Sequence, residues 1–307
     1  MPVSTSIHLS YCVALIVHLA PRSVLDIGCG FGVWGFLCRE YLDVSSGRIR
    51  PQQWKTRIDG IELFEPYVQD HQRALYSSIR IADIRDALPD LDTYDLIIAG
   101  DVIEHLEKGE GEDVLEALYD KAQKALLVNI PLGEGWEHPE AYGNPGELHR
   151  SMWAEEDFTA YPHALERFQL PNGLYGVFCC LKNVAPTARR DGLMASAERY
   201  ERRGDAARAI RALERAQALD PACREAGVLL ADLAIRHGTP NRAVGALETL
   251  LAAVADYHEG HVMLAKLLAS LGLHKEARER LGCLLQMSNL AAQIRQEAEA
   301  LLHAMGR

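Results

Sequence analysis

The sequence predicts an α/β domain built on a seven-stranded, mostly parallel sheet, followed by an all-α domain of helical repeats. Between about residues 22 and 182, short apolar runs bounded by turn residues alternate with helical patterns. That alternation is typical of strand–helix units that wind a parallel sheet. After residue 190 the chain becomes rich in Ala, Leu, Arg and Glu. There Gly204, Gly238 and Gly272 recur every 34 residues, which indicates stacked helical units.

Composition limits the class of protein. The 307 residues, with 48% hydrophobic content, can fill the cores of two domains. The net charge of −11 opposes a phosphate backbone, so no nucleic-acid partner is expected. The stretch from Ile7 to Ala20 is apolar but has no positively charged lead, so we expect the first helix there and no signal peptide. No run reaches the roughly 18 apolar residues of a membrane span, so no membrane association is expected.

The cysteines indicate a reducing compartment. Their number is odd, they lack C-x-x-C spacing, and most lie in apolar runs. We therefore expect reduced, buried thiols in a cytoplasmic protein. The seven are Cys12, Cys29, Cys38, Cys179, Cys180, Cys223 and Cys283.

The seven expected strands are short apolar segments that end at turn residues. They are Ser23–Ile27, Arg57–Glu62, Ile79–Ala82, Tyr94–Ala99, Ala125–Asn129, Leu165–Gln169 and Gly176–Leu181. Helix-length segments separate the first five, as parallel strands require. The last two flank the turn-forming cluster Pro171-Asn172-Gly173, so an antiparallel pair is expected at one edge of the sheet.

The segment 184–190 shows neither apolar period nor strand character, and it predicts the domain boundary. The first domain is expected over residues 1–186 and the repeat domain over 191–307. Three further sets of residues keep the 34-residue period: Ala197, Ala231 and Ala265; Ala209, Ala243 and Ala277; Leu213, Leu247 and Leu281. Three helix pairs are expected, and an amphipathic helix over Leu290–Met305 would cover the open end of the stack.

This repeat resembles the tetratricopeptide repeat (TPR) family, whose unit is a helix–turn–helix of 34 residues. Asp220-Pro221 matches the proline that follows the second helix, whereas Ala255 and Asn289 stand there in the later repeats. The alternative is a helical bundle of another kind. The resemblance implies a groove of mixed charge lined by Met194, Glu198, Arg202, Val228, Asp232, Arg236, Val262 and Lys266. Such a groove binds a peptide or protein; otherwise the stack mediates dimerisation or packs on the first domain.

Polar residues follow the first strands of the predicted sheet. The first strand ends at Asp26 and leads into a glycine turn at Gly28 and Gly30, where the backbone can bend tightly beside a ligand. Glu62 ends the second strand, where a carboxylate can accept hydrogen bonds from both hydroxyls of a ribose. Asp83 and Asp101 end the third and fourth. Because ligands bind at the carboxyl ends of parallel strands, these groups mark a nucleoside site, which on this pattern alone could also hold a dinucleotide.

The chain resembles class I S-adenosylmethionine (SAM)-dependent methyltransferases over residues 5–183. The resemblance is carried by two motifs, D-I-G-C-G-F-G and Y-D-L-I-I-A-G-D-V-I-E-H-L, and by the acid Glu62 at the end of the second strand. A dinucleotide-binding oxidoreductase lacks both the E-H-L and the late hairpin. The resemblance implies a Rossmann-like sheet and the cofactor SAM, with S-adenosylhomocysteine (SAH) as product. It also implies a methionine subsite at Asp26, Gly28, Cys29 and Gly30, a ribose contact at Glu62, adenine contacts at Leu63, Asp83 and Ile84, and Asp101 beside the sulfonium.

Catalytic candidates lie after strands four and five. Methyl transfer depends mainly on in-line alignment, and a base is needed only for a protonated acceptor. His105 and His149 are the candidates for that base, with Asp101 and Glu104 as further polar groups. The long loop 143–153 would hold the acceptor. This loop region combines aromatic and polar side chains: Trp136, Tyr142, His149, Arg150 and Trp153. Alternatively, Trp153 and Phe158 only anchor the next helix.

Glu104, His105, His138 and His149 could also form a metal site resembling that of some divalent-ion-dependent methyltransferases. None of these residues has the tight spacing of metal ligands, so no metal is predicted.

These observations predict an enzyme that transfers a methyl group from SAM to an oxygen or nitrogen atom. The acceptor would be a peptide, protein or carrier-bound substrate recruited by the repeats. One alternative is a methyltransferase for a free natural product or sugar, with repeats that dimerise the chain. Another is a non-catalytic SAM-binding scaffold, against which the intact Asp26, Gly28, Gly30 and Glu62 argue.

Overall fold

The computed structural model describes residues 5–136 and 143–306, which form two compact units that divide between Val184 and Ala185. This division lies at the start of the segment 184–190, where the sequence predicts the boundary. Helix α6 begins at Pro186 and continues to Arg202. Proline is favoured at the first position of a helix because it has no N–H to leave unbonded there.

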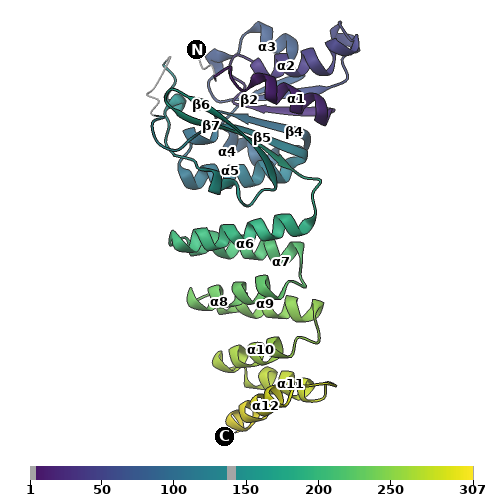
Figure 1. The fold of residues 1–307 in the computed structure, drawn as a ribbon, viewed down its shortest axis with the longest axis vertical. Coiled ribbons are helices and arrows are strands. Elements are labelled where there is room, and N and C mark those ends of the chain that lie inside the picture. Colours follow the sequence, from purple (N-terminus) through teal and green to yellow (C-terminus); the bar gives the residue numbers. More distant parts are fainter. Residues whose placement is uncertain (1–4, 137–142, 307) are drawn as a thin grey trace. The chain divides into compact units, whose positions relative to one another are not determined.

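The first unit alternates helices and strands (Figure 1). Its α-helices are α1 (Leu9–Leu19), α2 (Val33–Leu42), α3 (Asp70–Leu75), α4 (Ile84–Ala87) and α5 (Lys108–Lys121). Its strands are β1 (Ser23–Ile27), β2 (Arg57–Glu62), β3 (Ser78–Ile81), β4 (Tyr94–Gly100), β5 (Ala122–Leu132), β6 (His163–Leu170) and β7 (Gly173–Leu181). Short 3-10 helices are η1 (Val44–Ser46), η2 (Pro51–Gln53), η3 (Glu65–Tyr67), η4 (Leu88–Asp90), η5 (Ile103–His105), η6 (Pro145–Glu147) and η7 (Glu155–Phe158).

The seven strands form one sheet in the order β3-β2-β1-β4-β5-β7-β6. Strands β1 to β5 pair in parallel, and β7 runs antiparallel to both β5 and β6. The expected mixed sheet with an antiparallel edge is confirmed. Leu170 pairs with Gly173, so Pro171 and Asn172 form a two-residue turn.

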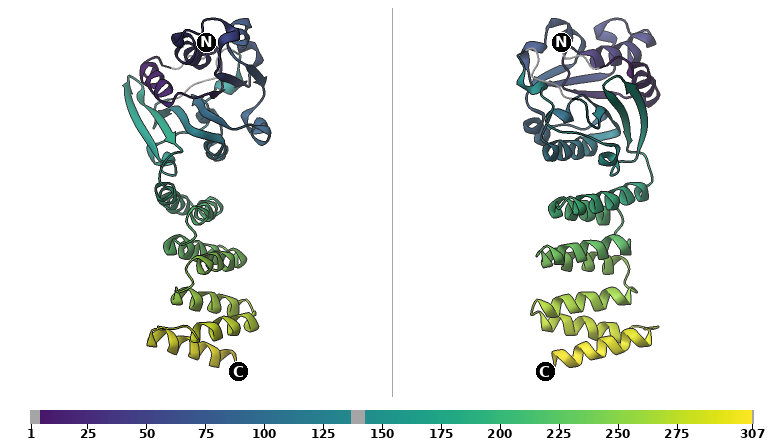
Figure 2. Two further views of the ribbon diagram at one scale, coloured as in Figure 1. Left: turned by 90° about the vertical axis from the view of Figure 1, so that its right-hand side faces the viewer. Right: turned by 60° about the vertical axis from the view of Figure 1, so that its left-hand side comes forward.

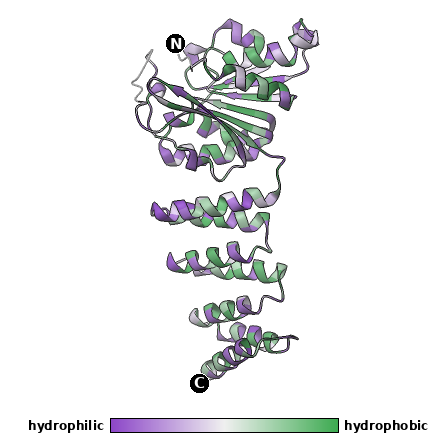
Figure 3. Ribbon diagram, viewed as in Figure 1, coloured by the Kyte–Doolittle hydropathy of each residue, from purple (hydrophilic) through white to green (hydrophobic). Residues whose placement is uncertain are grey.

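Helices cover both faces of this sheet, α1, α2 and α3 on one face and α4 and α5 on the other (Figure 1). The central strands β1, β4 and β5 are buried along most of their length and are coloured largely as hydrophobic in Figure 3. Burial on both faces explains why these strands read as continuous apolar runs in the sequence. On the first face, Cys12 and Ile16 of α1 pack with Trp34 and Cys38 of α2 over the strands.

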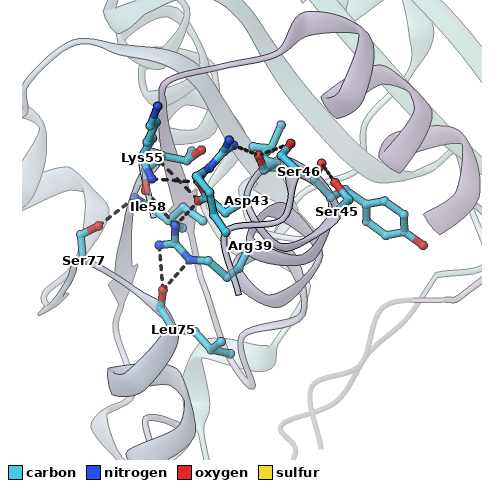
Figure 4. A network of polar contacts seen from close by, with 12 residues as sticks. Arg39, Asp43, Ser45, Ser46, Lys55, Ile58, Leu75 and Ser77 are labelled. Carbon is cyan, nitrogen blue, oxygen red and sulfur yellow. Dashed lines mark hydrogen bonds and ion pairs between the residues drawn. The ribbon is translucent and has the colours of Figure 1, made fainter. Parts of the chain in front are cut away.

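A buried ion pair fixes the end of α2 (Figure 4). The Arg39 guanidinium contacts the Asp43 carboxylate four residues later, and both side chains are almost completely buried. Arg39 also donates to the backbone carbonyls of Leu75 and Thr56, and Asp43 accepts from the backbone N–H of Lys55. Because each charge has several partners, the network ties α2 to the residues just before β2 and to the last residue of α3.

The second unit is a stack of helices, which Figure 2 shows in two views. Its helices are α6 (Pro186–Arg202), α7 (Ala206–Leu219), α8 (Arg224–Arg236), α9 (Pro240–Ala253), α10 (His258–Ser270), α11 (His274–Leu285) and α12 (Ala292–Met305). Gly204, Gly238 and Gly272 adopt positive φ angles in the turns within the three pairs, which explains their 34-residue period. The periodic Ala and Leu residues are all buried between helices.

Two expectations for side chains need correction. Val262 does not face a groove: it is 3% exposed and packs with Leu281, Leu284 and Ala298, because α12 covers this side of α10. Five cysteines are buried as expected, but Cys223 is half-buried and Cys283 is exposed. Within residues 5–136 and 143–306, no helix combines the length and apolarity needed to cross a membrane.

Candidate functional site

A cavity of about 540 Å³ opens at the carboxyl ends of β1 to β5 in the first unit. Side chains and backbone from the ends of all five strands and from the loop after β5 line it. The cavity brings together ten of the residues predicted from the sequence: Gly28, Cys29, Gly30, Glu62, Leu63, Asp83, Ile84, Asp101, His105 and His149. Its volume is within the range of small-molecule sites.

Asp26 is the predicted site residue that does not line the cavity. Its side chain is completely buried, and the Tyr76 hydroxyl donates a hydrogen bond to its carboxylate at 2.5 Å. Successive side chains of a strand point to opposite faces of the sheet, and Asp26 points toward the face covered by α2 and α3. Burial raises the pKa of Asp26 to about 7, although the Tyr76 hydrogen bond opposes the shift.

The glycine turn after β1 is held by the end of β2. The N–H groups of Gly28 and Cys29 donate to the carbonyl of Ile61, and the N–H of Gly30 donates to the Glu62 carboxylate at 2.8 Å. Gly28 has a φ of +64°, and a Cβ there would lie 2.8 Å from the Cγ2 atom of Val102. The turn therefore directs these three N–H groups to protein acceptors rather than toward a phosphate.

Glu62 is the buried acid of the cavity wall. One carboxylate oxygen accepts from Gly30, and the other accepts from the N–H of Phe64 at 2.9 Å. Burial raises its pKa, whereas the backbone hydrogen bonds from Phe64 and Gly30 lower it. Each carboxylate oxygen offers two lone pairs, so both oxygens can still accept a hydroxyl group from a ligand.

Asp83 lines the cavity, but its carboxylate is already paired with Arg85. The Arg85 side chain contacts both Asp83 oxygens, at 3.0 and 2.6 Å, and its backbone N–H donates to one of them. These hydrogen bonds lower the pKa of Asp83. Sequence reasoning missed Arg85, although its place two residues after the strand-ending acid is the signal that could have found it.

Asp101 occupies an unusual backbone conformation at the end of β4. It has a φ of +51° without being glycine, and its N–H donates to the carbonyl of Asn129. Non-glycine residues with this conformation cluster at functional sites. The Tyr175 hydroxyl of β7 donates to the Asp101 carboxylate at 2.8 Å. Tyr175 also lines the cavity and was not predicted; its position in the strand beside β5 was the available signal.

The loop after β5 is anchored to η5 by backbone hydrogen bonds. The N–H groups of Arg150 and Ser151 both donate to the Glu104 carbonyl, at 2.8 and 3.0 Å. This attachment brings His149 next to His105, with ring centroids 4.9 Å apart. Trp153 is buried against Phe158 and does not line the cavity, in agreement with the anchoring interpretation. His138 and Tyr142 lie outside the described residues.

Glu104 lies behind the cavity wall and is 1% exposed. Neither of its carboxylate oxygens accepts a hydrogen bond from an N–H group within the part of the chain that the structure describes, and its polar neighbour is the Asp101 carboxyl group. Burial and, next, the charge of Asp101 raise its pKa well above the ordinary value. One ligand atom each from Glu104, His105 and His149 lie within 4.8 Å of one another. Tight sequence spacing was therefore not needed to bring these three groups together.

The cavity has an acidic and aromatic lining. Among its described lining residues are four carboxylates, and none is Lys or Arg. The acids are Glu62, Asp83, Asp101 and Glu147. Aromatic rings from Phe31, Trp34, Tyr67, Trp136 and Tyr175 complete the lining. Such a surface attracts cations and repels anions.

No protein-family model and no curated protein matches this chain. Solved structures similar to it include the SAH-bound magnesium protoporphyrin IX methyltransferase of Synechocystis PCC 6803, at 16% identity and a TM-score of 0.42 over 57% of this chain and 82% of that one. A SAM-dependent methyltransferase from Archaeoglobus fulgidus matches at 16% identity and a TM-score of 0.40, over 55% of this chain and 93% of that one. The 1,6-didemethyltoxoflavin-N1-methyltransferase of Burkholderia thailandensis, with SAH bound, matches at 17% identity and a TM-score of 0.42. The match covers 58% of this chain and 79% of that one.

Proposed function

We propose that the first unit binds SAM and transfers its methyl group to an oxygen or nitrogen acceptor. The observation that carries the proposal is a cavity with four carboxylates and no Lys or Arg among its described lining residues. SAM carries a positive sulfonium and a positive ammonium group, which this lining attracts. The pyrophosphate of a dinucleotide would meet like charge, and the N–H groups of the glycine turn are already bonded to protein acceptors.

In the proposed complex, each part of the cofactor contacts a different part of the lining. Glu62 accepts hydrogen bonds from the ribose hydroxyls, and the turn at Gly28, Cys29 and Gly30 lies along the methionine part. Leu63 and Ile84 provide apolar contacts for the adenine, whose amino group donates to Asp83. All these residues line one cavity, which supports a single bound nucleoside.

Asp101, His105 and His149 form the proposed catalytic wall. All three line the cavity, and the two imidazole rings are in contact. Their role is to align the acceptor with the methyl carbon and sulfur and, for a protonated acceptor, to remove its proton. An imidazole suits the second task because its ordinary pKa is close to neutral pH.

The second unit is proposed to be a TPR-like domain that recruits a peptide, protein or carrier-bound substrate. Its 34-residue period of buried small residues and turn glycines supports the family resemblance. Glu198, Arg202, Asp232 and Lys266 are exposed on the first helices of the pairs. Surfaces of mixed charge formed by stacked helix pairs bind peptides in repeat proteins.

Calorimetry with SAH on the full chain tests the cofactor assignment. We expect one SAH bound per chain with a micromolar dissociation constant, and no heat of binding with NAD⁺ under the same conditions. A folded chain that does not bind SAH, or that binds NAD⁺ more tightly than SAH, contradicts the proposal. Transfer of radiolabel from methyl-labelled SAM then separates an enzyme from a binding scaffold.

A further inference from the structure

We propose that Glu104, His105 and His149 bind one divalent transition-metal ion at the cavity wall, and that this ion binds the oxygen of a hydroxyl acceptor. These three residues are called the Glu–His–His cluster. Their ligand atoms lie within 4.8 Å of one another, and both histidines line the cavity. Metal–ligand bonds of about 2.1 Å place neighbouring ligand atoms roughly 3 to 4 Å apart, so small side-chain rotations complete the site.

The buried carboxylate of Glu104 is the first observation that points to a cation. It is 1% exposed, and within the described chain neither oxygen accepts a hydrogen bond from an N–H group; its polar neighbour is another acid, Asp101. A buried carboxyl group in this state is costly unless a proton or a cation neutralises it.

The second observation concerns the hydrogen bonds of the two histidines. His149 Nδ1 lies 2.5 Å from the carbonyl oxygen of Trp136, and His105 Nδ1 lies 3.3 Å from that of Leu148. A carbonyl can only accept, so in both rings Nδ1 carries the proton and the lone pair is on Nε2. Metal-binding histidines almost always donate their other ring N–H to a carbonyl or carboxylate in this way.

The third observation is that the backbone holds the cluster together. Glu104 and His105 belong to η5, and the Glu104 carbonyl accepts two N–H groups from the residues directly after His149. The ligands from two distant segments are therefore positioned before any ion binds. Preorganisation of this kind is what a metal site of defined geometry requires.

The donor set indicates the kind of ion and its use. Two imidazoles and one carboxylate suit Mn²⁺, Fe²⁺, Co²⁺ or Zn²⁺. They suit Ca²⁺ less well, because Ca²⁺ prefers oxygen ligands only. Three protein ligands leave positions for the acceptor. The ion lowers the pKa of the bound hydroxyl, whose proton passes to water. Its oxygen then bonds the methyl carbon as the carbon–sulfur bond breaks, and the electron pair stays on sulfur in neutral SAH.

The ion's role in the reaction rests on the proposed function, whereas its binding does not. The test is calorimetry of MnCl₂ into the chelator-treated full chain, with Mn²⁺ magnetic resonance as a second readout. We expect one Mn²⁺ per chain. Glu104→Gln, His105→Ala and His149→Ala should each weaken binding at least about tenfold. His163→Ala is the matched control, because His163 Nδ1 also contacts a backbone carbonyl but lies outside the cluster.

SAH titrations of the same proteins separate the two proposals. SAH binding without Mn²⁺ binding, or Mn²⁺ binding that survives all three substitutions, overturns the metal site alone. Mn²⁺ binding that depends on the cluster, without SAH binding, keeps the site and overturns methyl transfer. Glu104→Gln keeps the shape of the side chain and removes its charge. A loss of Mn²⁺ binding in this variant therefore reports the missing charge and not a failure to fold.

Discussion

The Glu62 carboxylate accepts a hydrogen bond at 2.8 Å from the backbone N–H of Gly30, which lies 32 residues earlier in the chain. The bond joins the end of β2 to the turn after β1, the two elements assigned to the ribose and the methionine part of SAM. One carboxylate therefore shapes the glycine turn and is available to the ligand. We expect a substitution of Glu62 to affect both the glycine turn and the binding of the ligand.

Glu62→Ala is expected to weaken SAH binding by tens-fold or more. It removes two charge-assisted hydrogen bonds to ribose, each worth about 1.5 to 3 kcal/mol. Glu65→Ala is the matched control, since Glu65 is an exposed acid three residues away. Calorimetry with SAH measures both, and equal dissociation constants for the two variants would disprove the ribose assignment.

Gly28→Ala should both destabilise the first unit and weaken SAH binding. Alanine at a positive φ costs about 1 to 2 kcal/mol, and its Cβ would contact the Val102 side chain. Gly47→Ala is the matched control, because Gly47 has a φ of +80° with nothing within 4 Å of the added carbon. We expect Gly47→Ala to lower stability without changing SAH affinity. Unchanged SAH affinity in Gly28→Ala would contradict the place of the turn in the site.

Urea unfolding followed by tryptophan fluorescence measures these stabilities. All four tryptophans, Trp34, Trp54, Trp136 and Trp153, belong to the first unit. The signal therefore reports the unfolding of that unit separately from the helical unit.

The strands and their carboxyl-end acids could be predicted because their pattern has a simple physical cause. A strand buried on both faces must be apolar throughout, and parallel strands bring their carboxyl ends to one edge. Glu62 and Asp101 could therefore be placed at one edge from sequence spacing alone, and the structure puts both in the cavity wall. The antiparallel edge followed from a turn-forming cluster between two short strands.

Other features of the site depend on tertiary contacts that the sequence does not encode locally. The face toward which Asp26 points depends on where α2 and α3 pack. The pairing of His105 with His149 depends on backbone hydrogen bonds that close a long loop onto η5. Sequence spacing can place a residue at a strand end, but it cannot say which distant loop will pack against it.

Asp26→Asn should remove a pH dependence from the stability of the first unit. The folded pKa of about 7 is above the ordinary value of about 3.9. Between these values the unfolded chain loses the proton that the folded chain keeps, so stability falls as pH rises, by up to about 1.4 kcal/mol per pH unit. Above the folded pKa no further loss occurs.

Unfolding at pH 5 and at pH 8 measures the effect. The stability difference between Asp26→Asn and the unmodified chain should favour the variant more at pH 8 than at pH 5. Asparagine can still accept the hydrogen bond from Tyr76, which limits other changes. Asp90→Asn, at an exposed position, is the control. Parallel pH profiles for the unmodified chain and Asp26→Asn would contradict a raised pKa.

Asp43→Ala should destabilise the first unit by about 3 to 5 kcal/mol, because it leaves the buried Arg39 without its counter-charge. The exposed pair Arg167–Glu155 is the matched comparison. Their side chains are 52% and 35% exposed, so Glu155→Ala should cost about 1 kcal/mol or less. A cost for Asp43→Ala as small as that of Glu155→Ala would show that the Arg39 network does not stabilise the fold.

Residues 1–184 expressed alone should keep the SAH affinity of the full chain to within about twofold, or roughly 0.4 kcal/mol. All described residues that line the cavity belong to the first unit, so no cofactor contact is removed. Turnover on a peptide- or carrier-bound acceptor should fall, because the repeats no longer raise its local concentration. Turnover on the same acceptor free in solution should not change. An equal loss on both acceptors would mean that the repeats support the catalytic unit instead of recruiting its substrate.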